Sequence, residues 1–227
     1  EQCEYIRDGI VWKNFVRDIE YFLNNTNNAR VTFMSAFNLL SAPTFQKFLE
    51  YVLTLKKKYS ANGVQNWMNS DDVPFEIDCF PTISGSSINR PNDENVARVG
   101  IDIPYVRQPD FLDARLLTKD VLTNYLIPAY EYMTENAVVN GWTDNIRFEV
   151  QEIEKFRRIL FDLIIQVRYT NEDETRQNYT YSRARRRFLG FTQEYEKRRN
   201  KNFVKTFPEL EHFYTICKLE QEKHNDK

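Results

Sequence analysis

Cysteine and histidine are the side chains of this 227-residue chain that could bind a metal or act as a nucleophile or base. The three cysteines, Cys3, Cys79 and Cys217, lie far apart, with no pair at metal-ligand spacing. His212 and His224 have no partner at ligand spacing either, and we expect both in solvent. The sequence therefore predicts no metal site, contains no complete catalytic constellation and leaves the catalytic residues unknown.

A second kind of chemistry is suggested by the basic segment at residues 183–201. Its arginines could contact phosphate groups, and the aromatic residues beside them could stack on bases. Acidic residues lie in the same segment, as they do on the solvated face of an ordinary helix, and the net charge of −2 gives no overall attraction to nucleic acid. A nucleic-acid-binding or other non-catalytic interaction module is therefore the alternative function. The basic residues of the segment are Arg183, Arg185, Arg186, Arg187, Lys197, Arg198, Arg199 and Lys201.

Two apolar segments, residues 31–37 and 99–103, are the elements that would position an active site. Each is a predicted strand, and between them Phe45, Leu49 and Val52 fall on one face of a helix. This is the pattern of a β-α-β unit, whose strands run parallel. Ligands of parallel sheets bind at the carboxyl ends of the strands, so we expect any functional site to follow these two segments.

The remaining pattern predicts an α/β part followed by a mostly helical extension, with a soft boundary that divides the chain into residues 1–140 and 141–227. A helix is expected over 11–23, an alternating strand over 75–79 and a loop over 82–95. A helix over 118–133 should kink at Pro128. A long amphipathic helix over 148–167, a polar gap over 171–181, a basic helix over 182–199 and a short helix from Pro208 follow.

Several blocks of the sequence resemble radical S-adenosylmethionine (radical SAM) proteins of the twitch-domain type found in phage and environmental sequences. The resemblance covers most of the chain and corresponds to the C-terminal part of those proteins. Its blocks are Arg7-Asp8-Gly9 before Trp12, residues 33–41 and 45–50, residues 101–113, Phe188-Leu189-Gly190-Phe191, residues 194–199 and Thr206-Phe207-Pro208-Glu209-Leu210.

The resemblance implies part of a partial (β/α)6 barrel with parallel strands. It also implies reductive cleavage of S-adenosylmethionine to a radical that abstracts hydrogen from a substrate, here unknown. The three-cysteine motif that holds the 4Fe-4S cluster in the family does not occur in this chain, whose scattered cysteines cannot replace it. We therefore expect the distal portion of a longer enzyme, inactive alone, with the cluster and cofactor held together with a missing N-terminal half.

The resemblance also implies the site residues. Arg7 would pair with the carboxylate of the cofactor, Ser35 and Asn38 would reach its ribose, and Tyr105 and Arg107 would border the substrate. Each residue has a simpler reading as well. Arg7 could be a surface residue beside a helix, Asn38 a local cap, and Ser35 could face either the sheet interior or a helix layer.

No apolar run approaches the roughly 20 residues that a membrane helix needs. No secretory signal is visible, and an odd, sparse set of cysteines is typical of a reducing compartment, so we expect a cytoplasmic protein.

Overall fold

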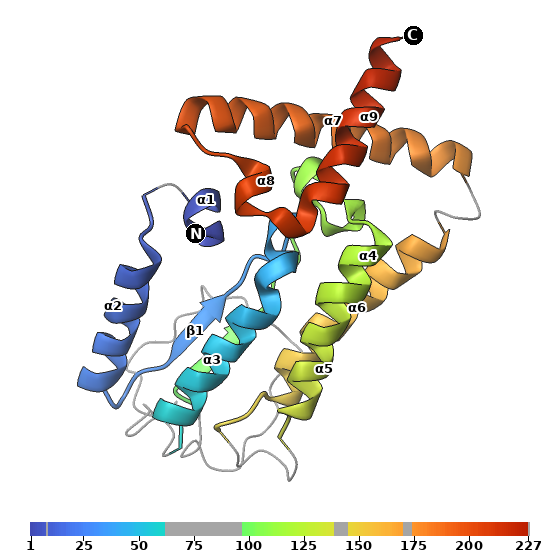
Figure 1. Cartoon of the computed structure of the whole chain (residues 1–227). Coiled ribbons are helices and arrows are strands. Elements are labelled where there is room, and N and C mark those ends of the chain that lie inside the picture. Colours follow the sequence, from blue (N-terminus) through green and yellow to red (C-terminus); the bar gives the residue numbers. More distant parts are fainter. Residues whose placement is uncertain (8, 62–96, 139–144, 170–173, 227) are drawn as a thin grey trace, which may run out of the picture.

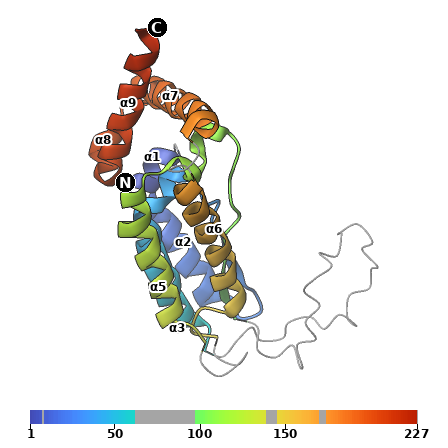
Figure 2. The ribbon, with the colours of Figure 1, turned by 90° about the vertical axis from the view of Figure 1, so that its right-hand side faces the viewer.

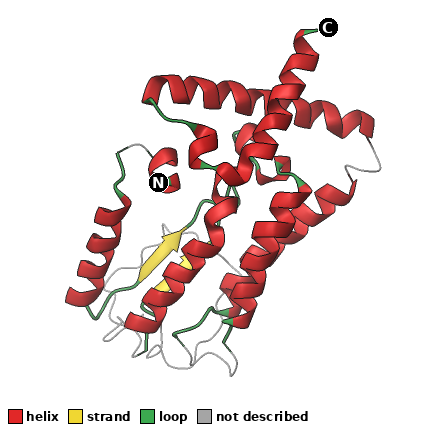
Figure 3. Cartoon of the chain, viewed as in Figure 1, coloured by secondary structure: helices red, strands yellow, loops and turns green. Residues whose placement is uncertain are grey.

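The computed structural model describes residues 1–7, 9–61, 97–138, 145–169 and 174–226. In these ranges the chain is mainly helical, with two short strands, β1 (Val31–Met34) and β2 (Val99–Asp102), that form one sheet. Figure 1 shows the long helices beside the sheet, and Figure 3 shows how little of the chain is strand. None of the described helices is both long and apolar enough to cross a membrane.

The two strands are parallel neighbours, as the sequence predicts. Val31 pairs with Val99 and Phe33 with Ile101, and an isolated bridge between Phe37 and Tyr105 extends the ladder. The helix α3 (Phe45–Tyr59) follows β1 and buries its apolar face on the sheet. The residues that fill this layer are Phe33, Phe37, Phe45, Leu49, Val52, Leu53, Val99 and Ile101, all nearly inaccessible to solvent.

The predicted partial (β/α)6 barrel is wrong for this chain, because the described residues contain only the β1–β2 pair and β2 cannot accept another strand on its free side. There the backbone N–H of Val99 donates to Ser60 Oγ at 3.1 Å, and the N–H of Ile101 donates to Glu152 Oε1 at 2.8 Å. Side chains thus occupy the hydrogen-bonding groups that a neighbouring strand would need. The strand expected over 75–79 and the loop expected over 82–95 lie outside the described residues.

Glu152 belongs to α6 (Val150–Tyr169), which packs on β2. Its carboxylate also lies 3.0 Å from the Nζ of Lys56, in the last turn of α3, and accepts the backbone N–H of Glu149 at 2.8 Å. Both members of the ion pair are buried, Lys56 with a side-chain exposure of 0% and Glu152 of 5%. This pair fastens α3 and α6 to the closed edge of the sheet.

The N-terminal helices pack on the same face of the sheet as α3. The helix α2 (Trp12–Asn25) sets Trp12 against Tyr51 of α3 and Phe15 against Phe33 of β1. Buried Arg98, just before β2, donates to the carbonyl oxygens of Leu23 and Thr26 at the end of α2. A cation at this position suits both the unpaired carbonyls and the dipole of the helix.

The interruption expected at Pro128 takes the form of a π-helical turn, η6 (Leu122–Leu126). It lies between α4 (Lys119–Val121) and α5 (Ile127–Glu135), directly before the proline. Proline lacks the N–H that would continue the α-helical ladder, so the turn before it is a place where the helix can widen. The resulting helix packs against α3 and α6.

The C-terminal helices close one end of the molecule. The helix α7 (Glu174–Arg199) already begins at Glu174, so the polar gap expected up to residue 181 is wrong from that residue onward. Figures 1 and 2 show α7 and α9 (Glu211–Asn225) crossing above the long helices, at the end towards which β1 points. The short segments between them are α8 (Phe203–Thr206) and η7 (Pro208–Leu210).

An aromatic cluster joins the two chain ends. Tyr5 of α1 (Gln2–Ile6) contacts Tyr195, Phe203 and Phe207 at ring-centroid distances of 5.1–6.1 Å. Buried residues from both sides of the predicted boundary near residue 140 belong to one hydrophobic cluster. The division into two parts stays a prediction.

Candidate functional site at the carboxyl end of the strands

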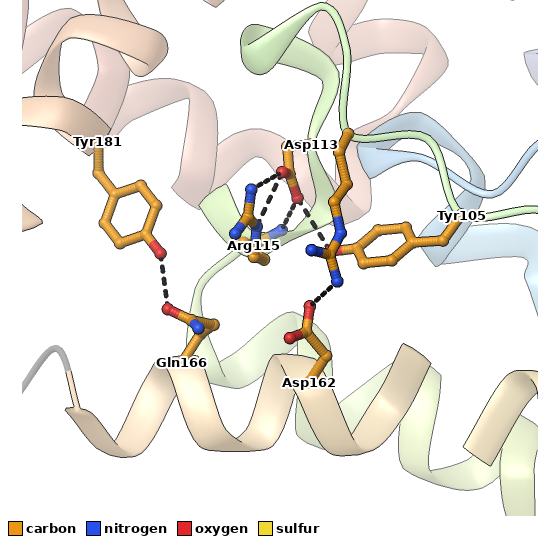
Figure 4. A network of polar contacts seen from close by, with 7 residues as sticks. Tyr105, Asp113, Arg115, Asp162, Gln166 and Tyr181 are labelled. Carbon is orange, nitrogen blue, oxygen red and sulfur yellow. Dashed lines mark hydrogen bonds and ion pairs between the residues drawn. The ribbon is translucent and has the colours of Figure 1, made fainter. Parts of the chain in front are cut away.

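The segment that leaves β2 carries a polar network centred on Asp113 (Figure 4). The Asp113 carboxylate is almost fully buried, with 4% of its side chain exposed. It accepts hydrogen bonds from the Tyr105 hydroxyl at 2.9 Å and from the Arg115 backbone N–H at 2.9 Å. The Arg115 guanidinium adds bonds from Nε at 2.8 Å and from Nη2 at 2.5 Å. Donors to both oxygens compensate the burial of this charge.

The network fixes the protonation states of its members. Burial raises the pKa of Tyr105, and the neighbouring Asp113 carboxylate raises it further. The hydrogen bond with Asp113 raises the pKa of Arg115. Tyr105 is therefore a neutral hydrogen-bond donor and Arg115 a permanent cation. Neither can act as a general base near neutral pH.

A second set of contacts runs between the end of β2 and α6. Lys155 Nζ lies 2.7 Å from Asp102 Oδ1, and Arg107 Nη2 lies 3.1 Å from Asp162 Oδ2. The Arg107 guanidinium also stacks over the Tyr105 ring at 5.0 Å. About half of the Arg107 side chain, 52%, is exposed. Arg107 is thus a cation that is held in place and still open to solvent, as a group that receives a polar ligand must be.

Contacts from α7 complete the site. The Tyr181 hydroxyl donates to Gln166 Oε1 at 2.9 Å, and Arg187 Nη1 lies 2.6 Å from Asp110 Oδ1. Next to Arg115 the structure leaves a cavity of about 10 Å³, lined otherwise by Ala114, Leu117, Leu122, Leu126 and Leu163. This volume holds at most one water molecule, so a ligand would have to meet the exposed rim near Arg107.

The structure brings together Tyr105 and Arg107, the two residues predicted on the substrate side. Ser35 lies on the same face of the extended chain as Phe33 and Phe37, because side chains alternate along a strand, so it faces the helix layer. Asn38 caps the 3-10 turn η1 (Leu39–Thr44), with its Oδ1 accepting from Leu40 N at 2.9 Å and its Nδ2 donating to Ala36 O at 3.0 Å.

The cofactor roles assigned to Ser35, Asn38 and Arg7 stay predictions. Arg7 is exposed at the C-terminal end of α1. Within the described residues, no hydrogen bond or ion pair joins it to Ser35 or Asn38.

Sequence reasoning missed Asp113 and Asp162, which organise the site. Asp113 stands two residues before Arg115 in an irregular segment, and Asp162 lies on a helix far along the chain. A carboxylate flanked by Tyr and Arg after a strand was the available signal. It does not say which cation each carboxylate meets.

The described residues do not fit an iron–sulfur cluster. No group of three or more His, Cys, Asp or Glu side chains in the described ranges could hold a metal ion. Cys217 is buried, which raises its pKa to about 12, and Cys3 lies at the other end of the chain. Cys79 is outside the described residues.

The basic segment is largely engaged within the fold. Arg185 pairs with Glu220 at 2.8 Å, Arg187 with Asp110, and Arg198 with Glu194 at 2.6 Å. A nucleic-acid backbone would have to compete with these carboxylates, so the geometry does not favour the alternative function.

Comparisons with protein-family models, with curated proteins and with solved structures found no match for this chain.

Proposed function

We propose that this chain is the distal, substrate-side part of a radical SAM enzyme and is inactive alone. The observation that carries the proposal is the parallel β1–β2 pair, whose carboxyl ends meet at the Phe37–Tyr105 bridge beside the exposed Arg107. The blocks of sequence that resemble the family include these same strands and the segment after them. The substrate remains unspecified.

In this proposal the chain orients the substrate. Arg107 is half-exposed and permanently charged, and both the Tyr105 ring and Asp162 hold it in place. Buried Asp113 keeps Tyr105 in position. Because a bound group held at two points loses less freedom on meeting a ligand, such a cation suits recognition of an anionic or strongly polar substrate.

The proposal assigns the 4Fe-4S cluster and S-adenosylmethionine to the polypeptide that carries the three-cysteine motif. When bound there, they supply the radical. The described residues of this chain contain no donor set for the cluster. A cytoplasmic location belongs to the same proposal, since a reducing compartment keeps thiolate ligands available.

The test is co-production of the 227-residue chain with the polypeptide encoded directly upstream, followed by anaerobic iron–sulfur reconstitution. We expect reductive cleavage of S-adenosylmethionine, measured as 5′-deoxyadenosine, from the combined protein and none from this chain alone. Arg107→Ala should lower hydrogen abstraction from the substrate. Arg157→Ala, a matched change in an exposed ion pair on α6, should not. A combined protein that holds the cluster and cleaves no cofactor would overturn the proposal.

A further inference from the structure

The outer edge of β1 is the open side of the sheet in the described part of the chain. The N–H groups of Val31, Ser35 and Phe37 donate towards the β2 side, each at 2.8 Å, to carbonyl oxygens of Arg98, Asp102 and Pro104. Successive residues of a strand direct their backbone groups to opposite sides. The N–H and C=O groups of Thr32, Met34 and Ala36 therefore point away from β2.

The two edges of this sheet are built differently. Ser60 and Glu152 occupy the backbone donors on the free side of β2. Within the described ranges, no side chain does the same for β1. The fold thus ends the sheet at β2 and leaves it extendable at β1.

The β1 edge also lacks the features that protect a terminal strand. Natural edges carry charged residues, prolines or bulges that discourage pairing with another chain. Residues 31–37 contain neither a charge nor a proline. Thr32 and Ala36 are exposed, and Met34 leaves 70% of its surface in solvent. An uncharged, β-prone, exposed strand is a template for an added strand.

We infer that the outer edge of β1 pairs with an extended strand of the polypeptide that carries the cluster-binding cysteines. This inference rests on the proposed function and names the partner that it requires. A radical SAM enzyme needs the cluster, and the described residues of this chain do not hold one. The partner must therefore join this chain near the strand ends, where Arg107 and Tyr105 lie. Pairing at β1 continues the sheet whose carboxyl end carries these residues.

The key variant is Met34→Pro. It removes one outward N–H and leaves the N–H groups that donate to β2 in place, and proline is tolerated in edge strands. Met34→Leu is the matched control, because it keeps the N–H and a side chain of similar size. We expect the upstream polypeptide to bind Met34→Pro at least tenfold more weakly than wild type in isothermal titration calorimetry, and Met34→Leu to bind as wild type.

A second measurement does not depend on how well the proline variant folds. In wild-type protein, hydrogen exchange at the amides of Thr32 and Met34 should slow when the upstream polypeptide is added, because these groups become hydrogen-bonded. Unchanged exchange at both amides would overturn the inference. So would a homodimer of this chain that protects the same amides and excludes the upstream polypeptide.

The two proposals fail separately. If the upstream polypeptide protects β1 and the complex forms no 5′-deoxyadenosine, the proposed function is wrong and the docking surface stands. If 5′-deoxyadenosine forms while the β1 amides exchange as in the free chain, the function stands and the docking surface is wrong.

Discussion

Replacing Glu152 by Gln should be among the most damaging single changes in this protein. The Glu152 carboxylate lies 3.0 Å from Lys56 Nζ and accepts two backbone N–H groups, from Ile101 and Glu149, at 2.8 Å each. Lys56 has no other hydrogen-bond partner within the described residues, so its buried charge depends on this carboxylate. Removing one member of a buried ion pair costs about 3–5 kcal/mol, because the other charge is left uncompensated.

The double variant Lys56→Met/Glu152→Gln should be more stable than Glu152→Gln alone. It leaves no buried charge, and the Gln carbonyl can still accept one of the two backbone N–H groups. The remaining cost is that of the other N–H without an acceptor, about 1–3 kcal/mol. We therefore expect the double variant to recover roughly 2 kcal/mol of the loss.

The pH dependence gives an independent check through Lys56→Met. Burial raises the pKa of Glu152 above its ordinary value of 4.5, although Lys56 acts in the opposite direction. The folded state then holds this proton more tightly than the unfolded state. The stability that Glu152 contributes is complete below pH 4.5 and falls as the pH rises through the folded-state pKa. Without Lys56 this loss should be larger, so the penalty of Lys56→Met should grow between pH 5 and pH 8.

Urea denaturation followed by circular dichroism measures all three variants at both pH values. Glu154→Gln, in an exposed ion pair on the same helix, is the control and should leave the denaturation midpoint unchanged. The reasoning is refuted if Glu152→Gln is as stable as wild type, or if the double variant loses the sum of the two single losses.

Three further changes test other buried contacts. Ser60→Ala removes the acceptor of the Val99 N–H and should cost about 1–3 kcal/mol in urea denaturation, whereas Ser60→Thr keeps the hydroxyl and most of the stability. Arg98→Met leaves the last carbonyls of α2 without their buried donor; we expect a loss of about 2–3 kcal/mol and faster hydrogen exchange in the last turn of α2, and an unchanged rate there would contradict the capping role. Asp113→Asn deprives the Arg115 guanidinium of its carboxylate and should lower the melting temperature by roughly 4–10 °C, as measured by circular dichroism; an unchanged melting temperature would show that the network does not stabilise the fold.

Local pattern was sufficient for the elements with a strong period. The apolar stripe of residues 11–23 became α2, and the stripe from Phe45 to Leu55 became the buried face of α3. The segments at 31–37 and 99–103 became parallel neighbours, because a helix between two short apolar strands allows little else. Tyr105 and Arg107 could be placed together for the same reason, since they follow β2 directly in sequence.

Contacts between distant residues could not be predicted in this way. Lys56 reads in sequence as one of three lysines in the last turn of a helix, a solvated position in most proteins. Glu152 reads as an ordinary acidic residue in the first turn of another helix. Their meeting in the interior depends on how α3 and α6 approach β2, and that same meeting closes the strand edge and excludes the expected barrel.

The sequence by itself determined the helices, the strand pair and its direction, because each follows from the periodicity of neighbouring side chains. The tertiary structure decided which edge of the sheet is closed, which face Ser35 adopts and which cation each buried carboxylate meets. These outcomes depend on desolvation: a charge or a backbone N–H must find its partner once packing removes water, and only the packed chain defines which partner is within reach.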